Sequence, residues 1–170
     1  IQDTPFIVDV GTSTYQNNDR RAEERSTSSH NTVEINGREQ SEVWGAFRVA
    51  KRAKATIITE NNLTITATHD GYRKIKARHE RKFTFGTRSI SINDYVCGAS
   101  TAKAFFFFHP QVLVNLQNNK IQNLNVTLSF EGAEKSELCG YDYAVGFNKL
   151  EKGQKLTIHF TKHLLTTISI

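Results

Sequence analysis

His30 and Asn31 stand directly before a short alternation of apolar and polar residues, in the segment RSTSSHNTVEINGREQSEVWGAF (residues 25–47). A histidine changes charge near neutral pH, so it can transfer a proton or carry a positive charge in a site. Val33 and Ile35 have the period of a strand with one buried face, and His30 has the opposite parity. His30 is therefore predicted on the solvent side, either as a functional group or as a surface histidine without a role.

The other histidines offer weaker candidates. His69 is expected to face inward as a structural, hydrogen-bonded residue whose tautomer the neighbouring Asp70 could fix. The remaining ones, of which one lies at a predicted strand end, have no spacing that favours a role: His79, His109, His159 and His163. No pair has the i, i+4 spacing of a helical zinc site, and no compact cluster of His, Cys and Asp occurs in the sequence. The sequence thus predicts neither a metal site nor a cofactor.

Two groups of basic residues could attract a polyanion. They are Lys74, Lys76, Arg78 and Lys82, which share one strand parity, and Arg48, Lys51, Arg52 and Lys54. The formal net charge of +5 agrees with an anionic partner. The first group is either a polyanion-attracting stripe or a solvated face that protects a strand from aggregation. Neither group has the interleaved aromatics of an oligonucleotide platform, so nucleic acid is not predicted as a partner.

The elements that must position these residues are strands. Period-2 alternation recurs along the chain, as in Val33–Ile35, Leu63–Ala67, Leu124–Phe130 and Leu156–Phe160. The run Phe105–Phe108 has no polar face and predicts a central strand that is covered on both sides. Turn signals such as Asn36-Gly37 separate the strands. The pattern predicts an all-β fold, an antiparallel two-layer β-sandwich, whose interior contains Val33, Ile35, Phe47, Leu63, Ile65 and much of Phe105–Phe108.

Length and composition limit the alternatives. With 170 residues the chain is expected to form a single β-sandwich domain, residues 1–170. No apolar run is long enough to span a membrane, so no membrane span is predicted. Cys97 and Cys139 are either free thiols or a disulfide. Since the chain begins at Ile1 and contains no Met, it is expected to be a fragment of a longer protein.

Three motifs in order, RSTSSHNTVEINGREQSEVWGAFRVAKRAKA, THDGY and FFFFHP, carry a family resemblance. The combination of an Arg, a Ser-His-Asn-Thr sequence, a strand, an Asn-Gly turn and an acidic-aromatic segment resembles the C-terminal β-sheet domain of the heparinase II/III-like polysaccharide lyases. The resemblance covers most of residues 6 to 114, and the last third agrees only in its strand character.

The resemblance implies a two-part enzyme that cleaves uronate-containing acidic polysaccharide by β-elimination. An upstream α/α toroid domain of the same parent chain would supply a Tyr and a second catalytic group, and the sugar chain would lie between the domains. The family's β-domain histidine matches His30, which makes His30 the predicted catalytic residue. The resemblance also makes Arg25 and Asn31 candidates for substrate binding, although Asn31 could instead brace the turn and Arg25 could form a loop salt bridge. It further implies a periplasmic or secreted enzyme and an isolated chain that is inactive.

The resemblance does not extend to a metal site. Some members of the family carry a second His two residues after the catalytic one as a metal ligand, and this chain has Thr32 there. Two other functions stay open on the sequence alone. One is a non-catalytic module that binds acidic glycans or supports another domain, and the other, disfavoured by the missing aromatic pattern, is a nucleic-acid-binding β-domain.

Overall fold

The computed structural model describes residues 5–123 and 125–170. Within them lie the strands β1 (Val33–Ile35), β2 (Glu42–Trp44), β3 (Arg48–Lys51), β4 (Ala55–Glu60), β5 (Thr64–His69), β6 (Arg78–Phe85), β7 (Ser89–Cys97), β8 (Ala102–Phe108), β9 (Asn115–Gln117), β10 (Lys120–Asn123), β11 (Val126–Glu131), β12 (Lys135–Gly146), β13 (Lys149–Phe160) and β14 (His163–Ser169). The helical elements are α1 (Asp19–Glu24) and two 3₁₀ turns, η1 (Thr27–Ser29) and η2 (Arg73–Ile75). None of these helices could span a membrane.

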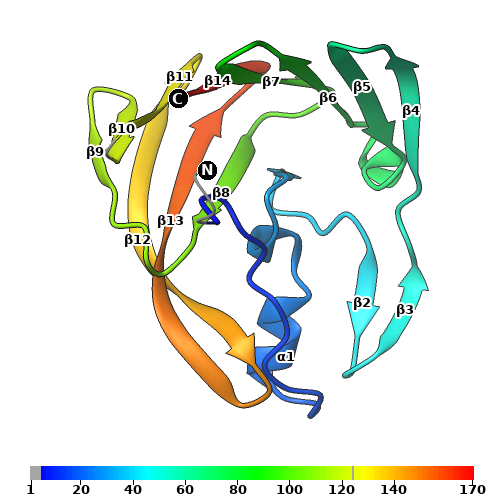
Figure 1. Cartoon of the computed structure of the whole chain (residues 1–170). Coiled ribbons are helices and arrows are strands. Elements are labelled where there is room, and N and C mark those ends of the chain that lie inside the picture. Colours follow the sequence, from blue (N-terminus) through cyan, green and yellow to red (C-terminus); the bar gives the residue numbers. More distant parts are fainter. Residues whose placement is uncertain (1–4, 124) are drawn as a thin grey trace.

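Two antiparallel sheets form the layers of the fold (Figure 1). The smaller sheet has the order β1-β8-β13-β12, and the larger one has the order β4-β5-β6-β7-β14-β11-β10-β9. A separate ribbon of β2 and β3 lies on the side of α1 opposite the long β12–β13 hairpin in the view of Figure 1. The predicted all-β antiparallel sandwich is confirmed.

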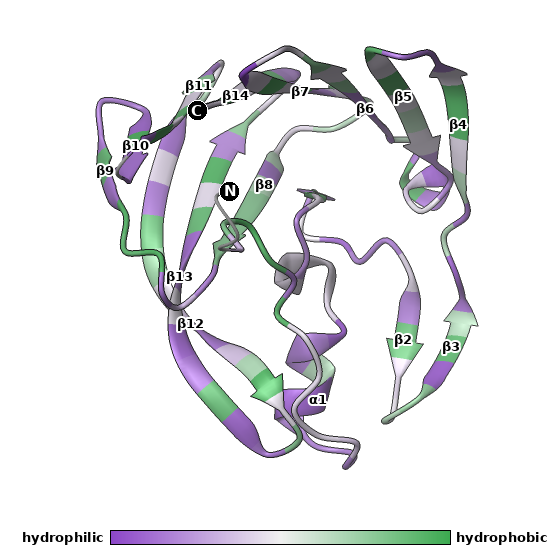
Figure 2. Cartoon of the chain, viewed as in Figure 1, coloured by the Kyte–Doolittle hydropathy of each residue, from purple (hydrophilic) through white to green (hydrophobic). Residues whose placement is uncertain are grey.

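The run of phenylalanines in β8 is buried on both faces of its sheet. Phe106 and Phe108 belong to the main core between the layers, whereas Phe105 and Phe107 pack on the other face with Val10. Each of the four is at most 3% exposed. A strand in this position needs no polar face, which is why the alternation stops there. Figure 2 shows how apolar residues concentrate along β8, and that the end of β12, at the tip of the β12–β13 hairpin, is apolar as well.

Most of the predicted interior is confirmed. Val33 and Ile35 are fully buried. The later alternating segments also have their apolar residues in the core: Val126, Leu128, Phe130, Leu156, Ile158 and Phe160. Leu124, which the same pattern placed inward, lies outside the described residues. Asn36 and Gly37 both have positive φ, as a two-residue hairpin turn requires.

The predicted burial of two residues is wrong. Leu63 is 61% exposed and Phe47 is 65% exposed. Leu63 lies in the β4–β5 turn, at the edge of an eight-stranded sheet whose partner sheet has only four strands. Because the smaller sheet cannot cover that edge, Ile65 is only half-buried there, and Thr66, of the other parity, is the buried residue. Phe47 lies in the β2–β3 turn and stacks on Tyr15 with ring centroids 5.8 Å apart.

The predicted basic stripe does not lie on one strand. Residues 73–75 form η2, and Lys76 ends it in the left-handed conformation with φ of 57°. Strand β6 therefore begins only at Arg78. Lys74 and Lys76 consequently leave the row that strand parity would have given them. Cys97 and Cys139 are both exposed free thiols, which excludes the disulfide in this structure.

Candidate functional site

His30 follows η1 in a loop that the surrounding hydroxyl groups hold in shape. The hydroxyls of Ser26 and Ser29 both donate to the carbonyl oxygen of Glu23, at 2.8 and 2.6 Å. The backbone N–H of His30 donates to Thr27 O at 3.2 Å, after which the chain becomes extended. The His30 side chain remains 42% exposed. Its predicted orientation toward solvent is confirmed, and its role stays a prediction.

Asp9 is the partner of the His30 imidazole. Nδ1 of His30 lies 2.6 Å from Oδ2 of Asp9. This hydrogen bond raises the pKa of His30 above its ordinary value, against the opposing effect of burial. Burial would raise the pKa of Asp9, but the hydrogen bonds from His30 and from the N–H of Gly11 outweigh it and lower that pKa. Because the Asp9 carboxylate accepts a hydrogen bond from Nδ1, the other ring nitrogen, Nε2, is available to interact with a group outside this pair.

Asn31 holds the segment that carries Asp9. Its side-chain Nδ2 donates to Val8 O at 2.8 Å, and its Oδ1 accepts the N–H of Phe107 at 2.9 Å. Val8 also donates its own N–H to Phe107 O, so the N-terminal segment runs beside β8 (Figure 1). Both ends of the Asn31 amide are thus used by backbone groups. Of the two predicted roles, this geometry fits the one in which Asn31 braces the turn. Binding of substrate by Asn31 stays a prediction.

A buried charged network supports the same loop from the other sheet. The guanidinium of Arg81 on β6 donates to Asn31 O at 2.7 Å and pairs with the carboxylate of Asp94 on β7 at 2.7 and 3.0 Å. Nε2 of His79 lies 2.7 Å from the same carboxylate. Asp94 is completely buried, and although burial would raise its pKa, the charge of Arg81 and the hydrogen bond of His79 lower it. The network fixes the backbone next to His30.

Arg25 braces the β2–β3 ribbon. Its guanidinium donates to Gly45 O at 2.7 Å and to Arg48 O at 2.9 Å. It therefore contacts backbone carbonyls here and not the carboxylate of a loop salt bridge. Its charge nevertheless lies in the same cavity as His30, so its predicted role in binding an acidic substrate remains a prediction.

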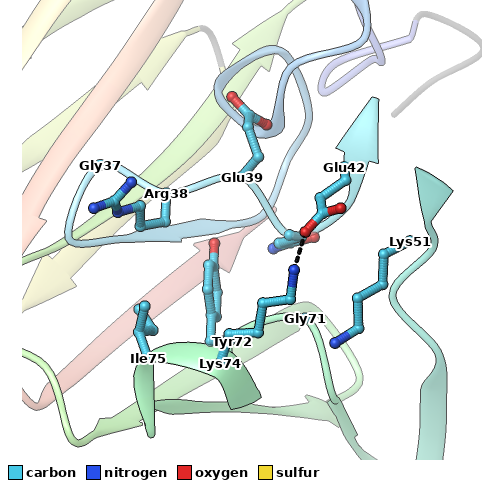
Figure 3. Close-up of a pocket in the computed structure, with 10 residues that line it drawn as sticks. Gly37, Arg38, Glu39, Glu42, Lys51, Gly71, Tyr72, Lys74 and Ile75 are labelled. Atoms are coloured by element: carbon cyan, nitrogen blue, oxygen red, sulfur yellow. Dashed lines mark hydrogen bonds and ion pairs between the residues drawn. The ribbon is translucent and has the colours of Figure 1, made fainter. Parts of the chain in front are cut away.

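The cavity at His30 has a volume of about 210 Å³ and includes Arg25, Glu39 and Arg52 in its walls. A neighbouring cavity of about 360 Å³ shares Glu39 and Gln40 with it. Figure 3 shows this neighbour, in which Lys74 of η2 pairs with Glu42 of β2 beside Lys51. Arg25 and Arg52 place two cations in the cavity of His30, as an anionic ligand would require.

His69 has a structural environment. It is half-buried, and burial lowers its pKa to about 4. Its Nδ1 accepts the N–H of Gly71 at 3.2 Å, whereas the Asp70 carboxylate accepts the N–H of Lys54 at 2.7 Å. The predicted structural role thus fits, but Gly71 and not Asp70 selects the tautomer. Among the described residues, no group of three or more His, Cys, Asp or Glu side chains could hold a metal ion.

Sequence reasoning missed Asp9, Arg81, Asp94 and the buried state of His79. The available signal for Asp9 was weak: a single acid within the apolar run FIVDV (residues 6–10), which is not the composition of a free terminus. Nothing in the local sequence pairs that acid with His30, because the two are brought together by contacts to β8.

The family model "Heparinase II/III-like, C-terminal" matches residues 1–164. Among solved structures, the chain is similar to a heparinase III with methylated lysines (16% identity, TM-score 0.74, covering 96% of this chain and 27% of that one). It is also similar to heparan sulfate lyase HepC from Pedobacter heparinus (16% identity, TM-score 0.71, covering 96% and 28%). No curated protein matches the chain.

The similarity to the solved structures shows a shared fold, and the chain spans little more than a quarter of their length. The family model covers nearly the whole sequence and confirms the resemblance read from the three motifs. The chain therefore belongs to the heparinase II/III-like C-terminal family.

Proposed function

We propose that this chain is the β-domain of a polysaccharide lyase that cleaves uronate-containing acidic polysaccharide by β-elimination. In this proposal, His30 contributes a catalytic side chain to a cleft shared with an upstream α/α toroid domain. The observation that carries it is the Asp9–His30 pair at the edge of a cavity that also contains Arg25 and Arg52.

The chemistry of β-elimination matches the groups in this cavity. The C5 proton of a uronate becomes acidic only when the C6 carboxylate is neutralised, and the reaction also needs a base for that proton and an acid for the leaving oxygen. Nε2 of His30 makes no hydrogen bond within residues 5–123 and 125–170, so it is the ring atom that can reach a substrate. Arg52 and Arg25 add positive charge where the carboxylate would lie.

Asp9 acts as a positioning residue in this scheme. It accepts from Nδ1, which fixes the tautomer and the orientation of the ring, and it raises the pKa of His30. A larger fraction of His30 is then protonated near neutral pH, and the imidazolium can neutralise a uronate carboxylate or protonate a leaving oxygen. The remaining proton transfers would fall to groups of the toroid domain.

The proposed substrate and location rest on the family to which the chain belongs. One similar structure is named a heparan sulfate lyase and another a heparinase III. We therefore place this chain in a periplasmic or secreted enzyme with a uronate-containing acidic polysaccharide as substrate. Its uronate epimer, sulfation and linkage would be read mostly by the toroid domain.

The test is a substitution in the intact parent protein. His30→Ala should lower turnover by at least ~10²-fold, the low end of what a positioned acid, base or charge-stabilising group contributes. Thermal unfolding should be nearly unchanged because the side chain is 42% exposed. The matched control is His69→Ala, which should mainly destabilise the fold. Full activity of folded His30→Ala, measured by absorbance of the unsaturated product, would refute the assignment.

A pH profile tests Asp9 separately. Asp9→Asn removes the carboxylate that raises the pKa of His30, so the limb of the rate profile that reports His30 should move to lower pH. A merely structural Asp9 would change stability and leave that limb in place. The isolated chain should show no appreciable turnover, because half of the positioned groups are absent. Binding of acidic glycan by the intact protein without any unsaturated product would favour the non-catalytic module instead.

A further inference from the structure

A third cavity, larger than the two described above, opens between β4, β5, η2 and the start of β6. Its volume is about 530 Å³, against about 210 Å³ for the cavity at His30. Four basic residues from these separate elements contribute to its walls: Lys54, Arg73, Lys76 and Arg78. None of the residues that line the His30 cavity is among them, so the two cavities are distinct.

The conformation of η2 is what gathers these cations. Lys76 closes η2 with its backbone N–H donating to Arg73 O at 3.0 Å, and its left-handed backbone turns the chain before β6 begins. A continuous strand would have spread these positions along a row. The 3₁₀ turn instead brings Arg73, Lys76 and Arg78 to one hollow.

The backbone of Lys54, which also lines this cavity, is held by a reciprocal contact with Asp70. Its N–H donates to Asp70 Oδ1 at 2.7 Å, and the N–H of Asp70 donates to Lys54 O at 3.3 Å. This pair ties the residue before β4 to the end of β5. Backbone hydrogen bonds therefore hold Lys54 beside the end of β5, where it lines the same cavity as Arg73, Lys76 and Arg78.

The charges in this cavity are not balanced by the protein. Within residues 5–123 and 125–170, Lys54, Arg73 and Lys76 form no ion pair, and Arg78 pairs with Glu80 at 2.8 Å. The one carboxylate in the wall, Asp70, already accepts a backbone hydrogen bond. The cavity of Figure 3 differs, because there Lys74 is paired with Glu42 and Glu39 adds a further acid. The excess of basic over acidic residues is thus larger in this third cavity than in the other two.

We propose that this cavity binds an acidic group, sulfate or carboxylate, of a polysaccharide chain at a site separate from His30. The polysaccharide class rests on the proposed function, whereas the anion chemistry rests on the cavity itself. The guanidinium of Arg73 suits the planar, bidentate recognition of a sulfate or carboxylate. The volume lies within the range of sites for small ligands. The wall contains no Phe, Tyr or Trp on which a nucleic acid base could stack, which favours a glycan over a nucleic acid.

The experiment measures binding by calorimetry with the intact parent protein. The ligands are a heparan sulfate hexasaccharide, the same hexasaccharide after desulfation, and a single-stranded oligonucleotide of equal charge. The variant Arg73→Gln/Lys76→Gln should bind the sulfated hexasaccharide about tenfold more weakly, which corresponds to about 1.4 kcal/mol. The control Lys120→Gln/Lys149→Gln removes the same charge from exposed positions on β10 and β13 and should bind within about twofold of the wild type.

The outcomes are distinct. If the variant binds as well as the wild type, or if the control loses as much affinity, the proposal is overturned. Tighter binding of the oligonucleotide than of the hexasaccharide would also overturn it. Comparison of the sulfated and desulfated ligands identifies which acidic group is bound. If the wild type turns over substrate and the variant binds unchanged, this binding site is refuted and the proposed lyase function stands. If the wild type binds the hexasaccharide specifically at this site without turnover, the lyase function is refuted and this binding site stands.

Discussion

His69 makes the stability of this fold depend on pH in a window that can be calculated. Burial lowers its pKa from 6.5 to about 4 in the folded chain. As the pH falls below 6.5, His69 therefore becomes protonated in the unfolded chain while it stays neutral in the folded chain. The stabilisation is complete above pH 6.5 and is lost as the pH falls toward 4. At about 1.4 kcal/mol for each pKa unit, the full effect is about 3 kcal/mol.

The substitution His69→Asn isolates this effect. The Asn side-chain oxygen can replace Nδ1 as the acceptor of the Gly71 N–H, and it does not titrate. Urea unfolding at pH 7, 6 and 5 should show that the free energy of unfolding falls less steeply with decreasing pH in the variant. The difference in slope should approach about 1.4 kcal/mol per pH unit.

The difference in free energy of unfolding between the wild type and His69→Asn cancels the contributions of the other titrating groups. His30, whose pKa is raised by Asp9, acts in the opposite sense, since it stabilises the fold below pH 6.5 and loses that effect as the pH rises. It is present in both proteins and cancels. His109→Asn is the matched control, because Nδ1 of His109 also accepts a backbone N–H two residues later, from Gln111 at 3.3 Å. Parallel curves for the wild type and His69→Asn would refute the reasoning.

Two further predictions concern the core and the charged network. Phe106→Ala, at a side chain that is 1% exposed, should lower the free energy of unfolding by about 3–5 kcal/mol in urea titrations, whereas Phe47→Ala should change it far less; equal losses would contradict the burial pattern. Arg81→Leu should cost about 3–5 kcal/mol, because it removes the cation that faces the fully buried Asp94 carboxylate; a loss below about 1 kcal/mol would contradict the ion pair.

The local sequence pattern was sufficient to predict the strands, but not to predict which parts of them the opposite sheet buries. The phenylalanines of β8 and the alternation around Val33 report burial directly, because the period of a strand fixes which side chains share a face. Leu63 has the same local signal, yet it is exposed because the four-stranded sheet ends before β4 and β5. The extent of one sheet relative to the other is a property of the whole chain. The residues around Leu63 in the sequence therefore carry no information on it.

The site shows the same limit. His30 could be placed outside the core by its parity, and the family motif identified it as a candidate. Asp9 is 21 residues away in sequence, and its contact with His30 depends on the N-terminal segment lying along β8. Likewise, the row of basic residues from Lys74 to Lys82 was visible, but the 3₁₀ turn that divides it between two cavities depends on the left-handed backbone at Lys76.

The network behind His30 explains how a loop can hold this proposed catalytic residue in a defined position. Removing the Arg81 and Asp94 charges from water is costly, and apolar residues in their place would often be as stable, so stability alone does not account for the pair. What apolar residues could not do is donate a hydrogen bond to Asn31 O. Through Asn31, Arg81 of the larger sheet is connected to the smaller sheet at Phe107 and to Val8, the neighbour of Asp9. Because both members of the Asp9–His30 pair adjoin residues held by this connection, their geometry depends on the packing of the two layers against each other.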